Sequence, residues 1–200
     1  MSSTFLKVTF IGDGAVGKTC IAIRMMENVF PEDFIPSVSD FDSRLTLEHA
    51  GTTVQLQIYD TMSREDGDRQ RAMGFPGTAV CCIVFSLVNP VSFENVSAKW
   101  LPEWKHHLPD VPAILLAAKS DLVSDAIVLS KLAAVNQVPI GTEARKFAFD
   151  HGLVYVETSA RTGSGIEELK AKLLELGLEH ESKRRSRALS PARKPKCILL

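Results

Sequence analysis

The sequence lacks several features that would place it in a specialised class of protein. None of its apolar runs is long enough to span a bilayer, and its N-terminus has neither the basic start nor the long apolar stretch of a signal peptide. Its four cysteines show no paired spacing and no histidine partners at zinc-ligand distance. Cys81 and Cys82 lie inside an apolar run and are expected to be buried thiols in a reducing compartment.

Acidic residues are absent from the end of the chain. The 200-residue chain has a net charge of −1, and residues from 183 onward hold seven basic side chains and no acidic one. Removing those seven positive charges leaves a net charge of −8 for residues 1–182. This distribution argues against a uniformly basic nucleic-acid-binding protein. It predicts one folded domain over residues 1–180 and a disordered, polybasic tail over residues 181–200.

Short apolar runs alternate with helix-like stretches along the chain. The predicted strands are Phe5–Ile11, Leu45–Glu48, Val54–Tyr59, Ala79–Leu87, Ala113–Ala118 and Val154–Glu157. The predicted helices are Cys20–Glu27, Ser92–His107, Ile127–Val135, Thr142–His151 and Ile166–Leu178. The turn Ala50-Gly51-Thr52 favours an antiparallel hairpin. Together these elements indicate an α/β fold, with a mainly parallel six-stranded sheet and helices on both faces.

A glycine-rich segment follows the first predicted strand. Its residues are Gly12, Asp13, Gly14, Ala15, Val16, Gly17, Lys18 and Thr19, which fit the spacing of a phosphate-binding loop. Backbone N–H groups in a loop between a strand and a helix point at a phosphate. Lys18 is expected to reach the β- and γ-phosphates, and the Thr19 hydroxyl to hold Mg²⁺. The alternative is an ordinary glycine-rich turn.

Three short motifs follow later strands, at the edge of the sheet where parallel sheets bind ligands. Asp60 is suited to bind Mg²⁺ through water. Asp121 can accept two hydrogen bonds from guanine that adenine cannot donate, and the stem of Lys119 can lie over the base. Backbone N–H groups around Ser159 and Ala160 can meet the guanine carbonyl oxygen. Each motif is weak alone, but their order behind a phosphate loop predicts a guanine-nucleotide site.

With these motifs the chain resembles a Ras-superfamily small GTPase of the Rho family, and it is most similar to Rac-type members. The similar stretches are Ile11–Cys20, Phe30–Val38, Phe85–Pro102 and the basic tail with its terminal cysteine. Residues 122–138 lie where Rho proteins carry an extra helix. The resemblance implies a P-loop small G-protein fold, GTP and GDP as ligands, Mg²⁺, and a signalling role on the actin cytoskeleton.

The resemblance also implies roles for individual residues and partners. Phe30 would pack against the base, and Ser37 would meet Mg²⁺ and the γ-phosphate. The segment Phe34–Asp42 would bind effectors together with residues 60–66, the segment called switch II in this family. Ala118 replaces the Asn or Thr that ties the base-recognition loop to the phosphate loop. Exchange factors and a guanine-nucleotide dissociation inhibitor are the implied regulators. The implied nucleotide-binding set is Asp13, Gly14, Ala15, Val16, Gly17, Lys18, Thr19, Cys20, Phe30, Ser37, Asp60, Ala118, Lys119, Asp121, Ser159, Ala160 and Arg161, with Thr19, Ser37 and Asp60 as metal ligands.

The largest departure from the family pattern lies in switch II, residues 60–66. Asp60-Thr61-Met62-Ser63-Arg64-Glu65 stands where the family has Asp-Thr-Ala-Gly-Gln-Glu. Ser63 takes the place of the glycine whose N–H meets the γ-phosphate, and Arg64 takes the place of the glutamine that orients the attacking water. Because arginine has donors only, the catalytic set of Arg64, Ser63 and Lys18 is expected to hydrolyse GTP slowly. The alternative is that Arg64 stabilises transition-state charge, as an arginine finger does.

The last four residues, Cys197-Ile198-Leu199-Leu200, fit the C-a-a-X prenylation pattern, and the final leucine favours a geranylgeranyl group on Cys197. The basic segment Lys183–Lys196 is expected to be a disordered arm that binds an anionic membrane together with the lipid. The expected location is the cytoplasmic side of the plasma membrane or of internal membranes, with a cytosolic pool.

Two hypotheses from different functional classes remain open. The first is a Rho-type GTPase that cycles slowly between GDP and GTP, and it is the one we favour. The second is a non-enzymatic, constitutively GTP-bound membrane scaffold. A weaker third hypothesis, an adenine-nucleotide P-loop enzyme, is disfavoured by Lys119 and Asp121 and by the lack of an evident acceptor-substrate site.

Overall fold

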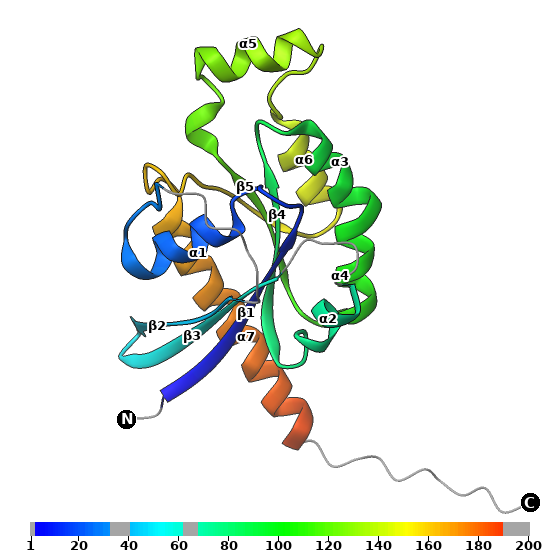
Figure 1. Cartoon of the computed structure of the whole chain (residues 1–200). Coiled ribbons are helices and arrows are strands. Elements are labelled where there is room, and N and C mark those ends of the chain that lie inside the picture. The colour runs from blue at the N-terminus through cyan, green and yellow to red at the C-terminus, as the bar shows by residue number, and fades with distance from the viewer. Residues whose placement is uncertain (1–2, 33–40, 62–67, 190–200) are drawn as a thin grey trace, which may run out of the picture.

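A six-stranded sheet forms the centre of the computed structural model, which describes residues 3–32, 41–61 and 68–189 (Figure 1). Its strands are β1 (Ser3–Gly12), β2 (Phe41–His49), β3 (Thr52–Asp60), β4 (Thr78–Ser86), β5 (Ala113–Ala118) and β6 (Val154–Glu157). Their order across the sheet is β2-β3-β1-β4-β5-β6, and only the β2–β3 pair is antiparallel. The predicted α/β class and mainly parallel sheet are confirmed.

Helices cover both faces of this sheet, as Figure 1 shows. They are α1 (Lys18–Glu27), α2 (Asp68–Met73), α3 (Pro90–Asn95), α4 (Leu101–His107), α5 (Ala126–Ala134), α6 (Glu143–Asp150) and α7 (Ile166–Leu189), with a π-helical turn η2 (Val96–Trp100) and a 3₁₀ turn η3 (Ser120–Leu122). One core cluster joins α1 and α7 to the sheet, and a second joins α3, η2, α4 and α6 to its other face. Helix α5 stands off from the sheet at the top of the view.

Strand β4 lies near the centre of the sheet and contributes side chains to both core clusters. All nine of its residues are buried, as expected for a parallel strand covered on both sides. Because side chains alternate along a strand, Cys81 belongs to one core cluster and Cys82 to the other. Burial raises the pKa of both thiols, so both stay protonated at neutral pH. The prediction that these two cysteines are buried is confirmed.

The helix predicted over residues 92–107 is continuous but changes geometry in its middle. A proline inside an α-helix has no N–H, and its ring clashes with the carbonyl four residues earlier. Pro102 occupies this position, and just before it the Leu101 N–H bonds to the Val96 carbonyl five residues back. This π-helical spacing lets the chain pass the proline without ending the helix.

The C-terminal helix differs from the sequence prediction. Helix α7 continues to Leu189, so the expectation of a disordered tail from residue 181 is wrong for residues 181–189. Ion pairs one turn apart join Lys183 to Glu179 at 2.6 Å and Arg184 to Glu181 at 3.0 Å. The first proline after α7 begins is Pro191, which allows the helix to extend this far.

Candidate functional site

The predicted phosphate-binding loop connects β1 to α1 and passes close to β4. Gly12 has a φ of +144°, and a Cβ added there would lie 2.1 Å from the Val84 carbonyl oxygen. Only glycine permits this approach. Gly17 has a φ of +113° and caps the start of α1, where helix N–H groups are available to an anion. The loop therefore has the strand–loop–helix setting that the sequence predicts.

Lys18 is the most buried charged group of this loop, with 5% of its surface exposed. Its ammonium group donates to the carbonyls of Gly12 at 2.9 Å and Asp13 at 2.8 Å. Burial lowers the pKa of Lys18 to about 8, although the carboxylates of Asp60 and Asp13 act in the opposite direction. A cation held this way at the mouth of a phosphate loop is suited to bind phosphate oxygens.

Two oxygen-bearing side chains meet beside Lys18. The Thr19 hydroxyl at the start of α1 donates to Asp60 Oδ2 at 2.5 Å, and Asp60 ends β3. One hydroxyl and one carboxylate fit Mg²⁺, which keeps several waters and takes its other ligands from bound phosphates. Within the described residues there is no cluster of three or more His, Cys, Asp or Glu side chains arranged for a metal ion.

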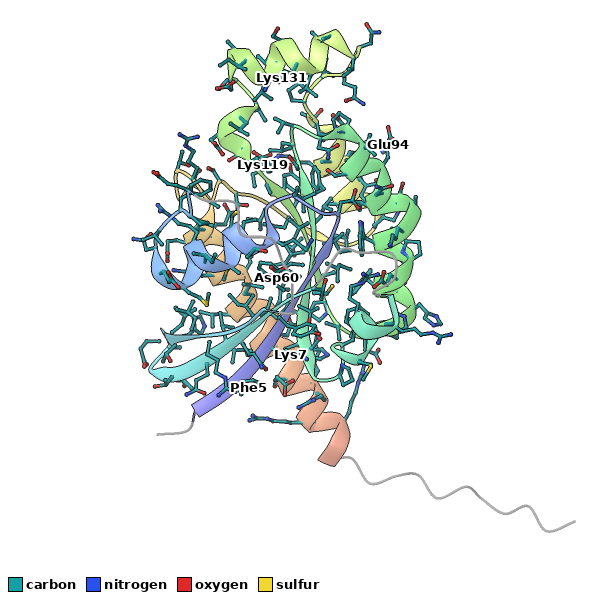
Figure 2. The ribbon with its side chains drawn as sticks, in the orientation of Figure 1. Phe5, Lys7, Asp60, Glu94, Lys119 and Lys131 are labelled. Atoms are coloured by element: carbon teal, nitrogen blue, oxygen red, sulfur yellow. The ribbon has the colours of Figure 1, made fainter. Side chains whose placement is uncertain are left out.

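The expected base-binding residues surround a cavity of about 250 Å³. It is lined by Gly17, Cys20, Ile21, Phe30, Ala118, Lys119, Asp121, Leu122, Ala160 and Arg161. These residues come from α1, the segment after it, and the loops after β5 and β6. Their convergence follows from the parallel topology, because the carboxyl ends of β1, β5 and β6 lie at one edge of the sheet. Asp60 and Lys119, labelled in Figure 2, lie toward this same end.

Lys119 bridges the base cavity and the phosphate loop. Its backbone has a φ of +64°, and its ammonium group donates to the Ala15 carbonyl at 2.7 Å. Burial lowers the pKa of Lys119. The side chain of Ala118 is buried beside Gly17 and has no polar atom to share in this bridge. The hydrogen bond from Lys119 to Ala15 therefore ties the loop after β5 to the phosphate loop.

The loop after β6 is held by its own backbone and by the loop after β5. Ser159 is fully buried, and its hydroxyl accepts from the Thr162 N–H at 3.1 Å. The Ser120 N–H donates to the Thr158 carbonyl at 3.1 Å, which fixes the two loops side by side. Ala160 and Arg161 follow at the cavity wall. This arrangement leaves the Ser159 side chain engaged within its own loop.

Several predicted site residues lie outside the part of the chain that the structure describes. They are Ser37, Ser63, Arg64, Cys197 and most of Phe34–Asp42.

The structure also adds residues and contacts that the sequence does not reveal. Ile21 and Leu122 line the base cavity but were not predicted, because apolar residues carry no chemical signature. Asp13 is in the expected nucleotide-binding set, and its carboxylate is bonded to Asn95 and Trp100, two partners that the sequence does not reveal.

The cysteine beside the base cavity remains a thiol. Burial raises the pKa of Cys20, and the thiol lines the cavity together with Lys119.

Across the described part of the chain, no helix is both long enough and apolar enough to cross a bilayer.

The comparison with known protein families agrees with this geometry. The model of the Ras family matches residues 7–177, which include the phosphate loop, Asp60, both base loops and all six strands except the start of β1. The match therefore covers nearly the whole sheet and all described residues of the candidate site. This chain belongs to the Ras family, and its domain is that of a small GTPase, a nucleotide-binding switch.

Proposed function

We propose that the chain is a Rho-type small GTPase that binds GTP and GDP with Mg²⁺ and acts as a membrane-tethered switch with slow GTP hydrolysis. The observation that carries the nucleotide assignment is the cavity shared by Lys119, Asp121, Phe30 and Ala160, joined to the phosphate loop through Ala15. A base in this cavity places its phosphates toward Lys18. This is the order in which a nucleoside diphosphate or triphosphate presents its groups.

Guanine rather than adenine is the base we assign to the cavity. Asp121 offers a carboxylate at the wall, and guanine presents two donors, N1–H and the N2 amino group, to such an acceptor. Adenine would leave the carboxylate without matching donors, at a cost of about 1–3 kcal/mol for each buried group left without a partner. Phe30 and the Lys119 stem supply apolar surface on which the ring can stack.

The phosphate end of the site is assigned to the loop and its two oxygen ligands. Lys18 would exchange the carbonyls of Gly12 and Asp13 for phosphate oxygens. Thr19 and Asp60 would hold Mg²⁺ together with Ser37, and the ion would neutralise charge on the phosphates. The buried position of Lys18 keeps its ammonium group aimed at one place, so its contribution is mainly electrostatic and positional.

Slow hydrolysis is proposed from the identities of Ser63 and Arg64. Positioning of the attacking water is nearly all that the protein contributes to phosphoryl transfer, and arginine cannot accept a hydrogen bond from that water. The experiment is single-turnover hydrolysis by the native protein, the Arg64→Gln/Ser63→Gly double variant and a normally cycling Rac-type control.

We expect hydrolysis by the native protein to be slower than that of the control by about 10-fold or more, and the double variant to recover part of the difference. If the native protein hydrolyses GTP at the control's rate, or the double change slows it further, the account of switch II is wrong. No measurable hydrolysis by either form would favour the GTP-bound scaffold instead.

The Rho assignment, the membrane and the partners rest on sequence resemblance together with two structural features. A separate helix, α5, occupies the segment 122–138 where Rho proteins carry an insert, and α7 presents basic residues up to Arg187. Geranylgeranyl-Cys197 and this basic segment would hold the protein at the cytoplasmic face of an anionic membrane. Effectors would bind Phe34–Asp42 and switch II, and exchange factors and a dissociation inhibitor would regulate the cycle on actin-linked pathways.

A further inference from the structure

The side chain of Asp13, a residue of the phosphate loop, is held by Asn95 of α3 and Trp100 of η2. Its Oδ1 accepts from Trp100 Nε1 and its Oδ2 accepts from Asn95 Nδ2, each at 2.7 Å. The backbone carbonyl of the same residue accepts from Lys18 at 2.8 Å. A displacement of Asp13 therefore moves one hydrogen-bond acceptor of the phosphate-binding lysine.

Trp100 connects this aspartate to two cations. The ring is 1% exposed, and it lies beneath Lys99 Nζ at 4.8 Å and Arg71 Cζ at 5.0 Å from its centroid. It is the last residue of the π-helical turn η2, a geometry found often at functional positions. Close-packed interiors transmit strain, so this buried ring cannot shift without disturbing its contacts with Asp13 and Arg71.

Arg71 links the ring to α2, the helix that directly follows the switch II segment in the chain. The side chain is 2% exposed despite its charge. It forms a forked pair with Glu103 of α4, with Nε 2.7 Å from Oε1 and Nη2 3.1 Å from Oε2. A buried pair of this kind resists separation, because moving one partner leaves the other charge without compensation. A movement of α2 must therefore carry Arg71 with it or break the pair.

We propose that Trp100 is a positioning residue that couples α2 to the phosphate loop, so that the position of α2 sets the rate at which the loop releases its phosphate ligand. The connection runs from Arg71 through Trp100 and Asp13 to Lys18, across three elements that are distant in sequence. The inference rests on the proposed guanine-nucleotide binding, and it adds the route by which switch II and the nucleotide affect each other.

The test compares two tryptophans on the same helical segment. Trp100→Phe keeps an aromatic ring against the two cations and removes the N–H that donates to Asp13. Trp104→Phe is the matched control, because the Trp104 N–H donates to the Val111 carbonyl at 3.0 Å instead. Release of a fluorescent GDP analogue is measured with Mg²⁺ present. We expect Trp100→Phe to release the analogue about tenfold faster than the wild type, and Trp104→Phe to stay within about twofold.

A second comparison tests the coupling itself. Arg71→Lys keeps the charge but cannot form the forked pair with Glu103. Arg71→Lys alone is expected to speed release of the GDP analogue. Added to Trp100→Phe, it is expected to raise the release rate by less than about twofold further, because both changes interrupt the same connection. Fully additive effects in the double variant would overturn the coupling. Thermal unfolding midpoints of every variant separate a loss of folding from a change in release.

The outcomes also separate this inference from the proposed function. If the wild type does not bind the analogue, the proposed function fails and the inference fails with it. If the wild type binds and Trp100→Phe releases at the wild-type rate, only the inference fails. Should Trp100→Phe not fold, Asp13→Asn provides the same test, since it weakens the acceptor while keeping the side-chain shape. If Asp13→Asn then releases the GDP analogue at the same rate as the wild type, the proposal is overturned.

Discussion

Lys18 shows how the environment of one residue sets the charge available to a ligand. Its pKa is lowered to about 8 by burial, so the free protein loses the ammonium charge as the pH rises through that value. Bound phosphate favours the charged form, so the affinity for GDP is expected to be constant below about pH 7 and to fall by up to about tenfold per pH unit above pH 8. Equilibrium titration with a fluorescent GDP analogue from about pH 6.5 to about pH 9 measures this.

The control for this pH dependence is Lys18→Ala, which has no ammonium group to titrate. Its weaker binding is expected to change less over the same range. An affinity of the wild-type protein that stays level or rises between pH 7 and about pH 9 would contradict the assignment of Lys18 to the phosphates.

Ala118 offers a second prediction at this scale, because threonine in the same place would add a hydroxyl and a methyl group to the side chain. Its Cβ faces Gly17, and a Cβ added to Gly17 would lie 3.7 Å from it. Ala118→Thr is expected to add a hydrogen bond between the base and phosphate loops and to slow GDP release by about 3- to 10-fold, as one net hydrogen bond allows. Ala118→Val has the same size without the hydroxyl, so equal slowing by both variants would contradict the hydrogen-bond explanation.

At the scale of secondary structure, apolar patterning was sufficient for the strands but not for every helix. The six predicted strands all exist, because buried parallel strands such as β4 and β5 are continuous apolar runs. Helix α2 has six residues and was not predicted, since fewer than two turns give too short a periodic pattern. Helix α7 was predicted eleven residues too short, because charged residues after Leu178 carry no apolar periodicity although they form ion pairs.

The length of α7 leads to a prediction about membrane binding. Basic side chains at 183, 184, 185 and 187 lie on the helix, whereas Arg193, Lys194 and Lys196 lie beyond the described residues. Each basic residue near an anionic leaflet contributes about 1 kcal/mol, and a single lipid anchors only marginally. Cys197→Ser is expected to release the protein to the cytosol, and neutralising the four helical residues to shift lipidated protein away from acidic membranes.

Fractionation of cells that express each variant measures this effect. Neutralising Arg193, Lys194 and Lys196 is the matched comparison, because it changes a similar number of charges outside the described helix. Equal membrane recovery of wild type and Cys197→Ser would reject lipid anchoring at this residue.

For the whole molecule, the sequence predicted the edge of the sheet at which the site lies, but not the contacts that support it. Asp60, Lys119, Asp121 and Ala160 could be placed together because they end or follow strands β3, β5 and β6, whose carboxyl ends lie at one edge of the sheet. The hydrogen bond from Trp100 to Asp13 spans 87 positions and depends on how a π-helical turn is oriented against the loop. No local pattern encodes such a contact, since it arises from the packing of α3, η2 and α4 on the sheet.

The most direct test of the account is whether the whole protein distinguishes guanine from adenine nucleotides. A fluorescent GDP analogue bound with Mg²⁺ is displaced by unlabelled GDP, GTP, ADP or ATP, for the wild type and for Asp121→Ala. We predict that GDP and GTP displace the analogue at least about 100-fold more effectively than ADP and ATP, and that Asp121→Ala loses most of this preference, because two donors of guanine lose their acceptor. Equal displacement of the analogue from the wild type by ATP and GTP would contradict the guanine assignment.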